Sequence, residues 1–193
     1  MKVIGITGGV GSGKSEVLNY MKEAFGAVIC QMDETARELQ KKGTGCYEKI
    51  VEYFGRDILA QDGELDRQKL GAIVFSDPEK LQALNGIVHP EVFRQVREEI
   101  RENELAGVPV YVVEAALLTE EGRALCEEFW YIYTSEEVRR ERLKKSRGYT
   151  DEKITQMIAS QPGEEEFRRA ATAVIDNSGA LEDTKRQIGE LLR

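Results

Sequence analysis

The sequence predicts an α/β fold in which a parallel β-sheet is flanked by helices. Short apolar or aromatic stretches alternate with helical stretches along the chain, which is the pattern of parallel strands joined by crossover helices. A glycine-rich segment also stands between the first apolar stretch and the first helical one. The length of 193 residues is enough for one core of ordinary size with a small appended part.

Five short strands are expected. Residues 3–7 (Val-Ile-Gly-Ile-Thr) form an apolar, β-branched run that is typical of a buried strand. The other strands are expected at about 27–32, 110–114, 129–133 and 173–176. Because helical stretches separate consecutive strands, we expect a five-stranded parallel sheet.

Helical periodicity occupies most of the remaining sequence. Apolar side chains fall on one face of the helix that follows the glycine-rich segment, at Val17, Leu18, Met21 and Phe25. Further helices are expected between the second and third strands, at residues 46–54, 66–75, 78–87 and 91–105. A final helix with an apolar face is expected to pack back on the sheet through Leu181, Ile188, Leu191 and Leu192.

The uneven spacing of the strands indicates two helical insertions. Residues 33–105 are too many for a simple crossover, so we expect a helical region beside the sheet that binds a substrate. Residues 135–171 are also helical in pattern and are expected to form a lid. The core of this single domain, 1–193, would then comprise about residues 1–32, 106–134 and 172–193.

The composition excludes several classes of protein. The net charge of −8 argues against a broad nucleic-acid surface, and the apolar runs are too short to span a bilayer. Residues 1–7 already form a strand, so we expect no signal peptide. The odd number of cysteines without CxxC spacing indicates reduced thiols and no zinc site: Cys30, Cys46 and Cys126. We therefore expect a cytoplasmic monomer or weak homo-oligomer that binds neither nucleic acid nor membranes.

Residues 8–15, Gly-Gly-Val-Gly-Ser-Gly-Lys-Ser, match the GxxxxGKS pattern of the phosphate-binding P-loop. Glycines let the backbone turn tightly and direct its N–H groups at an anion, and the helix N-terminus adds partial positive charge. Lys14 can reach the outer phosphates of a nucleoside triphosphate, and the Ser15 hydroxyl can bind Mg²⁺. The motif therefore predicts a triphosphate site without defining the reaction.

Two acidic residues are expected near this loop. Asp33 follows the second strand, at the carboxyl edge of the sheet where ligands of α/β folds bind. Its carboxylate can accept the proton of an attacking hydroxyl, help to hold Mg²⁺, or cap the next helix. Glu114 ends the third strand, where it either acts on Mg²⁺ through water or caps the strand edge.

Residues 139–147 carry six basic residues in nine positions of an acidic chain. Most of them are expected to form a solvated face paired with nearby glutamates. For Arg142 and Arg147 we favour a role in phosphoryl transfer, because a guanidinium binds phosphate oxygens bidentately. Gly148 directly follows them and is a candidate hinge of the lid.

A series of short motifs runs along the whole chain and is more specific than the P-loop, which many families share. It consists of Asp33 with Ala36-Arg37, Phe54-Gly55, Gly63-Glu64-Leu65-Asp66-Arg67, Leu70, Val74-Phe75, Leu84-Asn85, His89-Pro90, Leu117-Leu118 with Glu120, Arg142-Leu143, Gln161 and Val174-Ile175-Asp176-Asn177-Ser178-Gly179. In this ordered set the chain resembles the dephospho-CoA kinase family.

The resemblance implies a P-loop kinase that uses ATP and Mg²⁺ to phosphorylate the ribose 3′-hydroxyl of dephospho-CoA, the last step of coenzyme A synthesis. Residues 33–105 would bind the coenzyme. Asp33 would be the base, and Lys14 and Arg142 would stabilise the phosphoryl group. Arg37, Arg67 and His89 would lie on the acceptor side, although the chemistry of a lone histidine before Pro90 favours a structural role. ATP would contact Gly9, Val10, Gly11, Ser12, Gly13, Lys14, Ser15, Glu16, Arg147, Asn177 and Gly179.

The sequence departs from the family pattern at several places. Glu16 stands where the family usually has threonine, and it cannot offer a hydroxyl to the α-phosphate. Gln31 replaces the first acid of an Asp-x-Asp pair, which would leave any shared Mg²⁺ role to Asp33. Ser146 stands where a second lid arginine is usual, so Arg147 would act from a shifted position. Residues 116–120 read Ala-Leu-Leu-Thr-Glu where Pro-Leu-Leu-Phe-Glu is common.

Two other functions stay open at the level of sequence. A nucleoside or nucleoside monophosphate kinase would share the core and the lid, and only its acceptor pocket would differ. A nucleotide-dependent switch would belong to another class of protein. The sequence speaks against the switch, because it has neither the guanine-reading Asn-Lys-x-Asp motif nor an obvious switch segment between the first strands.

Overall fold

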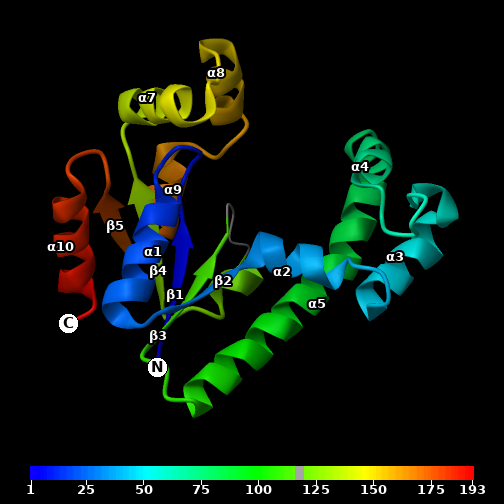
Figure 1. Cartoon of the computed structure of the whole chain (residues 1–193), viewed down its shortest axis with the longest axis horizontal. Coiled ribbons are helices and arrows are strands. Elements are labelled where there is room, and N and C mark those ends of the chain that lie inside the picture. Colours follow the sequence, from blue (N-terminus) through cyan, green and yellow to red (C-terminus); the bar gives the residue numbers. More distant parts are fainter. Residues whose placement is uncertain (116–119) are drawn as a thin grey trace. The chain divides into compact units, whose positions relative to one another are not determined.

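The computed structural model of the chain describes residues 1–115 and 120–193. Within them five strands form one sheet in the order β2-β3-β1-β4-β5, and β1 pairs in parallel with β3 and β4, as β4 does with β5 (Figure 1). The predicted five-stranded parallel sheet flanked by helices is thus confirmed. The strands are β1 (Lys2–Thr7), β2 (Val28–Gln31), β3 (Val110–Glu114), β4 (Glu128–Tyr133) and β5 (Ala173–Asp176).

Helices surround the sheet and fill the long insertion, and those expected at 46–54 and 66–75 are found to within one residue. They are α1 (Lys14–Phe25), α2 (Met32–Leu39), α3 (Gly45–Phe54), the short 3₁₀ helix η1 (Arg56–Ile58), α4 (Arg67–Phe75), α5 (Pro78–Leu105), α6 (Glu120–Arg123), α7 (Glu136–Arg147), α8 (Asp151–Ala159), α9 (Glu164–Ala170) and α10 (Leu181–Leu191).

The prediction of two helices separated near Pro90 is wrong. Residues 78–105 form the single helix α5, 28 residues long, with Pro90 inside it. A proline removes one N–H donor and crowds the carbonyl four residues earlier, which here belongs to Gly86. Buried Val88 and Val92 continue one apolar face across the proline.

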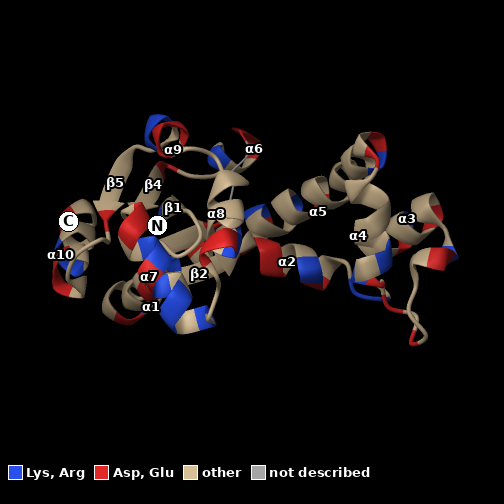
Figure 2. Cartoon of the chain, turned by 90° about the horizontal axis from the view of Figure 1, so that it is seen from above, with Lys and Arg blue, Asp and Glu red and all other residues tan. Residues whose placement is uncertain are grey.

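The chain divides into two compact units. The first comprises Met1–Cys30 and Glu102–Arg193 and contains the sheet, with α1 and α10 in contact on one side and α9 on the other (Figure 2). Its core is formed by fully buried side chains of the central strands and the helices packed on them, including Ile4, Ile6, Val17, Met21, Val112, Trp130, Ile132, Ile175 and Ile188.

The second unit, Gln31–Arg101, is helical and spans nearly the same residues as the expected substrate-binding region. Here α2 packs on α3, and η1 contacts α3 and α4. Side chains cap two of these helices: Thr44 accepts a hydrogen bond from the Tyr47 N–H at 3.1 Å, and Asp66 accepts from the first N–H groups of α4. The unit therefore has its own local framework, with Ile50 and Ile58 fully buried.

The carboxyl ends of β1, β3 and β4 lie side by side in the first unit. Ile6 pairs with Glu114, and Thr7 pairs with Tyr131, so the segments that follow these strands emerge at the same edge. Helices α7 and α8 lie beyond these strand ends (Figure 1). Ligands of open α/β sheets bind at this edge, and here it carries the P-loop.

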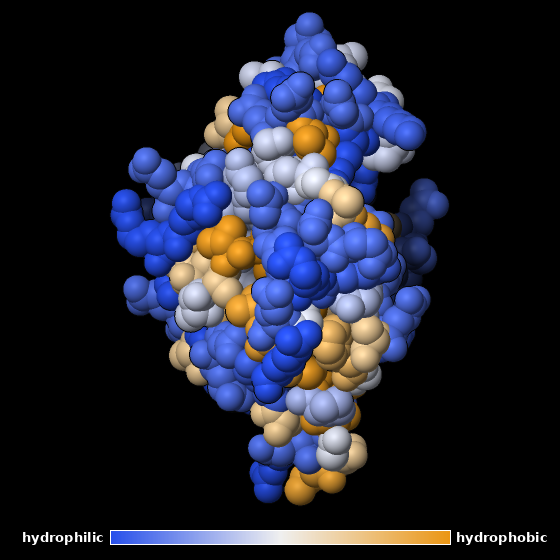
Figure 3. All heavy atoms as spheres, turned by 90° about the vertical axis from the view of Figure 1, so that its left-hand side faces the viewer, coloured by the Kyte–Doolittle hydropathy of each residue, from blue (hydrophilic) through white to orange (hydrophobic). Residues whose placement is uncertain are grey.

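One face of the molecule is shown with all its atoms in Figure 3 and is largely polar. On the face seen from the α10 side, charged and polar residues predominate and apolar residues form small separate groups (Figure 3). Lys and Arg residues gather along α7 (Figure 2). Within residues 1–115 and 120–193, no helix combines the length and the apolar character needed to cross a membrane.

Candidate functional site

The P-loop joins β1 to α1 and has a left-handed backbone at two glycines. Gly11 has φ 77°, and Gly13, the N-cap of α1, has φ 81°. Residues with a Cβ rarely adopt such angles. Close packing is a second constraint, because a Cβ on Gly13 would overlap the side-chain amide of Asn177. The glycine spacing of the motif thus follows from the shape of the loop.

The ammonium group of Lys14 lies at the start of the loop, beside Gly8 and Glu114. Its Nζ donates to the carbonyl oxygen of Gly8 at 2.7 Å and lies 3.7 Å from Oε1 of Glu114. Both charged side chains are mostly buried, with 18% and 14% of their surface exposed. Glu114 therefore lies inside the site beside Lys14, whose ammonium is suited to the outer phosphates of a nucleotide.

The carbonyl oxygen of Ser12 accepts hydrogen bonds from three other elements. Thr134, directly after β4, donates through Oγ1 at 3.0 Å, and Asn177, directly after β5, donates through Nδ2 at 2.8 Å. Arg142 of α7 donates through Nη1 at 3.5 Å. The Ser12 hydroxyl itself is buried and has no hydrogen-bond partner among the described residues. The loop thus contains one buried polar atom that a ligand can satisfy.

Asn177 connects the segment after β5 with the P-loop and with α7. Its side chain is buried, and its Oδ1 accepts from Oγ1 of Thr184 at 2.9 Å. Its backbone N–H donates to the Tyr133 carbonyl at 2.8 Å, and its carbonyl accepts from Nη2 of Arg142 at 2.9 Å. The structure therefore brings Arg142 and Asn177, both expected in the site, together at Ser12.

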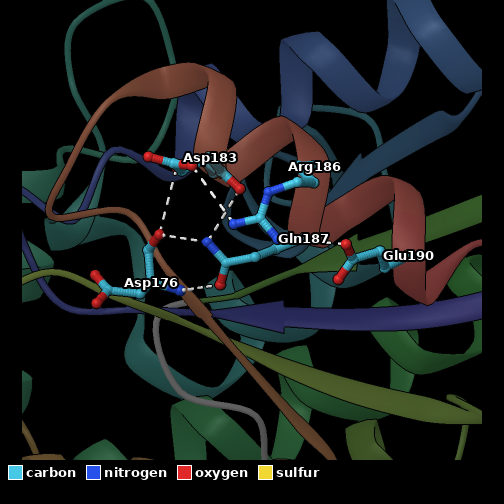
Figure 4. A network of polar contacts seen from close by, with 6 residues as sticks. Asp176, Asp183, Arg186, Gln187 and Glu190 are labelled. Atoms are coloured by element: carbon cyan, nitrogen blue, oxygen red, sulfur yellow. Dashed lines mark hydrogen bonds and ion pairs between the residues drawn. The ribbon is translucent and has the colours of Figure 1, made fainter.

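A polar network on α10 fixes the same segment (Figure 4). The Gln187 side-chain amide makes two hydrogen bonds with the Asp176 backbone, donating to its carbonyl and accepting from its N–H, each at 2.9 Å. Since β5 is an edge strand, one side of its backbone faces away from the sheet. Gln187 pairs with these groups, while Arg186 contacts Asp183 and Glu190 on the helix surface.

Arg139 and Gln161 bind the first half of the loop. Arg139 donates from Nε to the Val10 carbonyl at 2.8 Å, and Oε1 of Gln161 accepts from the Val10 N–H at 2.9 Å and from Nη2 of Arg139 at 3.2 Å. The expectation that Arg139 belongs to a solvated face is wrong. One signal was available in the sequence, because Arg139 precedes Arg142 by three residues and shares its helix face.

Four residues expected on the nucleotide side are exposed. Ser15 and Glu16 lie in the first turn of α1, and Gly179 lies between β5 and α10. Arg147 is the last residue of α7, and its side chain makes no hydrogen bond or ion pair within the described part of the chain. The structure thus brings Arg142, but not Arg147, to the P-loop.

The expected acceptor-side residues all belong to the second unit and are exposed. Asp33 and Arg37 lie on α2, Arg67 is the first residue of α4, and His89 lies inside α5. Asp33 is not a capping residue, because α2 begins before it and has Gln31 as its N-cap. The capping interpretation of Asp33 is therefore wrong.

Comparison with known proteins identifies the family. A family model of dephospho-CoA kinase matches residues 2–183. This chain belongs to the dephospho-CoA kinase family. A dephospho-CoA kinase from Carboxydothermus hydrogenoformans is 40% identical over 195 residues, which cover 100% of this chain and 94% of that protein. One from Streptomyces avermitilis is 41% identical over 192 residues, which cover 99% of this chain and 92% of that protein.

Solved structures show the same fold. A Thermus thermophilus protein superposes with a TM-score of 0.81 and 33% identity, over 99% of this chain and 96% of that one. The fold is shared by Campylobacter jejuni dephospho-CoA kinase, with a TM-score of 0.71 and 23% identity over 100% of this chain and 96% of that one. It is also shared by Acinetobacter baumannii shikimate kinase, with a TM-score of 0.52 and 20% identity over 100% of this chain and 93% of that one.

Membership of the dephospho-CoA kinase family makes the chain a nucleotide-using phosphotransferase that acts on an alcohol group of dephospho-CoA and yields CoA. Two departures from the family pattern have visible positions. Gln31 ends β2, and the Ser146 hydroxyl donates to the Arg142 carbonyl at 2.6 Å within α7. The motif residues Leu117 and Leu118 lie outside the described residues.

Proposed function

We propose that this chain transfers the γ-phosphoryl group of ATP to the ribose 3′-hydroxyl of dephospho-CoA, giving CoA and ADP in the final step of CoA biosynthesis. One observation carries the proposal: Lys14, Arg142 and Asn177 converge on a single glycine-rich loop in a chain of the dephospho-CoA kinase family. Positioned cations and backbone N–H groups are the main catalytic elements of phosphoryl transfer.

The loop residues fit a nucleoside triphosphate. The left-handed glycines shape a backbone turn at the N-terminus of α1, where N–H groups and the helix dipole favour anions. The Ser12 hydroxyl is buried without a hydrogen-bond partner in the described residues, and it can donate a hydrogen bond to a phosphate oxygen. We propose that residues 9–16 bind the phosphates and that Asn177 and Gly179 bind the base.

Mg²⁺ is proposed as the metal, held through Ser15. In phosphate sites this ion keeps several waters and takes one or two protein ligands together with phosphate oxygens. The exposed Ser15 hydroxyl, in the first turn of α1, offers such a ligand, and the Glu114 carboxylate lies in the same site beside Lys14. When bound, the ion neutralises charge on the phosphates.

We propose that the second unit binds the acceptor. Asp33, an exposed carboxylate in the first turn of α2, would accept the proton of the 3′-hydroxyl. Arg37 and Arg67 are exposed cations that suit the diphosphate of dephospho-CoA, and His89 would lie on the same side. This assignment rests on the family resemblance of these positions and on their exposure.

Residues 135–171 are proposed as the lid, with Arg142 stabilising the transferring group. Helix α7 ends at Gly148, whose φ of 63° gives a left-handed C-cap and a place where the chain can turn. Arg147, exposed at the end of the same helix, would reach the nucleotide only after this segment moves. Cys30, Cys46 and Cys126 form no disulfide bond, which supports a reducing compartment such as the cytoplasm.

The test is an assay of ADP release with ATP and Mg²⁺, in which dephospho-CoA, adenosine and AMP are compared as acceptors. We expect rapid release only with dephospho-CoA, CoA as the product by mass spectrometry, and loss of activity when EDTA removes Mg²⁺. A protein that is folded by circular dichroism but forms no CoA would contradict the proposal. Transfer to AMP or adenosine instead would identify a nucleotide or nucleoside kinase.

A further inference from the structure

Arg139 occupies a position at the P-loop that the proposed function leaves unassigned. Its guanidinium lies against Gly9, because a Cβ built on Gly9 would stand 2.6 Å from Nη2 and 2.8 Å from Cζ of Arg139. Two further contacts orient it, from Nε to the Val10 carbonyl and from Nη2 to Oε1 of Gln161. The group is thereby fixed against the first half of the loop.

This guanidinium is half-buried and lacks an anionic partner. None of the carboxylates in residues 1–115 and 120–193 lies within ion-pair distance of it, whereas the neighbouring Arg140 pairs with Glu136 at 2.7 Å. Burial lowers the pKa of Arg139, which reflects the loss of solvation around the charge. A desolvated cation is unfavourable until an anion compensates it, and the adjacent loop is an anion-binding motif.

The position of Arg139 along the loop indicates which phosphates it meets. The lysine of a P-loop reaches the β- and γ-phosphates, and here the Lys14 ammonium is anchored on the carbonyl of Gly8. Arg139 lies beside the next two residues, Gly9 and Val10. Both cations therefore stand at the end of the loop that receives the outer phosphates.

Arg142 is placed differently. Its guanidinium donates to the carbonyls of Ser12 and Asn177, at the end of the loop that enters α1. The two arginines are three residues apart on α7 and contact different residues of the same loop. Arg139 lies nearer to Gly8, where the ammonium group of Lys14 is anchored.

We propose that Arg139 binds the outer phosphates of ATP and stabilises charge on the phosphoryl group during transfer. The identification of ATP as the ligand rests on the proposed function. Nε keeps its bond to the Val10 carbonyl, while Nη1 and Nη2 donate to phosphate oxygens and Nη2 gives up Gln161. In the reaction the bond from the γ-phosphorus to ADP breaks, a bond to the acceptor oxygen forms, and the acceptor proton passes to Asp33. Arg139 forms no covalent bond.

Calorimetric titration of the full chain with ATP, ADP and AMP tests the proposal in wild type, Arg139→Gln and Arg139→Lys. Hydrogen bonds to charged groups contribute strongly to binding, so Arg139→Gln should weaken ATP binding about tenfold or more. ADP binding should weaken less, and AMP binding should weaken by less than about twofold. Arg139→Lys should recover part of the loss, because it keeps the charge but not the planar fork. With dephospho-CoA, kcat of Arg139→Gln should fall about 100-fold.

Lys145→Gln is the matched control, because it removes one positive charge from an exposed position on the same helix. It should leave all three affinities within about twofold of wild type.

Two results would overturn the proposal. These are unchanged ATP affinity in Arg139→Gln and an equal loss for ATP and AMP, the second of which would make Arg139 a structural anchor of α7. If wild type binds ATP but forms no CoA, the proposed function fails while the comparison of ATP with AMP still decides the role of Arg139. A wild type that binds no ATP would refute both.

Discussion

At the scale of single residues, the cations of the site are oriented chiefly by carbonyl oxygens. Lys14 donates to the carbonyl of Gly8, Arg139 to that of Val10, and Arg142 to that of Asn177. A carbonyl orients a cation through a hydrogen bond but does not cancel its charge, as a carboxylate would. Lys14 differs from the two arginines, because its Nζ also lies within ion-pair distance of Glu114, at 3.7 Å. Within residues 1–115 and 120–193, no carboxylate lies within ion-pair distance of Arg139 or Arg142, so the charge of these guanidinium groups is available to a phosphate.

The Asp33→Asn substitution tests the proposed base. Because asparagine keeps the size of the side chain but cannot accept the proton, we expect kcat to fall by about 100-fold or more while the ATP affinity stays within about twofold. Steady-state kinetics with dephospho-CoA and calorimetry with ATP would measure the two quantities. If both decrease together, Asp33 is a metal or structural residue instead.

Cys126 provides a test of burial in the first unit. Burial raises the pKa of its thiol to about 12, so only a very small fraction is the reactive thiolate at pH 8. We expect iodoacetamide to modify Cys126 at least about 100-fold more slowly in the native protein than in urea, as followed by peptide mass spectrometry. Similar rates in both conditions would show that the thiol is accessible in the native state.

The residues of the P-loop were predictable, because the spacing of its glycines, lysine and serine along the chain is enough to define the loop. Arg139 was not recognised, since the contact depends on which face of α7 meets the loop. That orientation is set by buried Leu143 and by contacts with segments distant in sequence, such as Gln161. Similar basic residues on one helix cannot be ranked before those contacts exist.

At the scale of elements, two glycines in helical contexts should respond in opposite ways to alanine. Gly13 has φ 81° and no space for a Cβ, so Gly13→Ala should lower the free energy of unfolding by at least about 1–2 kcal/mol and weaken ATP binding. Gly189 lies inside α10 with open space around it, so Gly189→Ala should raise the free energy of unfolding by about 0.5–1 kcal/mol.

Urea denaturation of both variants, with ATP titration of each, measures these effects. Gly189→Ala serves as the control, and its ATP affinity should equal that of wild type. A Gly13→Ala protein as stable as wild type would mean that the loop adopts another backbone geometry.

The strands and most helices were predictable because their apolar periodicity is local. The exception is α5, where a proline suggested a helix start that the structure does not have. The buried valines on either side of Pro90 explain the difference, because their burial outweighs the loss of one backbone hydrogen bond. Such a balance depends on tertiary packing and is not visible in the local pattern.

At the scale of the whole molecule, the two units should respond to different ligands. Hydrogen exchange by mass spectrometry should report ATP protection in residues 8–15 and 134–142, and dephospho-CoA protection within residues 31–101. At a concentration 100 times its dissociation constant, a ligand stabilises the state that binds it by about 2.7 kcal/mol. ATP protection confined to residues 31–101 would contradict the proposed division of roles.

The number and direction of the strands followed from their alternation with helices, but their order did not. The order β2-β3-β1-β4-β5 places Glu114 beside Ile6 and the segment after β4 beside the P-loop. This order depends on long-range pairing that a single sequence does not encode as a pattern. The family resemblance implied a P-loop kinase, but no strand order was predicted from it.

The Ser12 carbonyl has more donors than lone pairs. Such an oxygen has two lone pairs, and the contacts from Thr134 and Asn177, at 3.0 and 2.8 Å, are shorter than the 3.5 Å contact of Arg142. Detaching Arg142 from Ser12 consequently costs little. The stronger anchor of this arginine is the 2.9 Å bond from Nη2 to the Asn177 carbonyl, which a swing of the side chain also has to break.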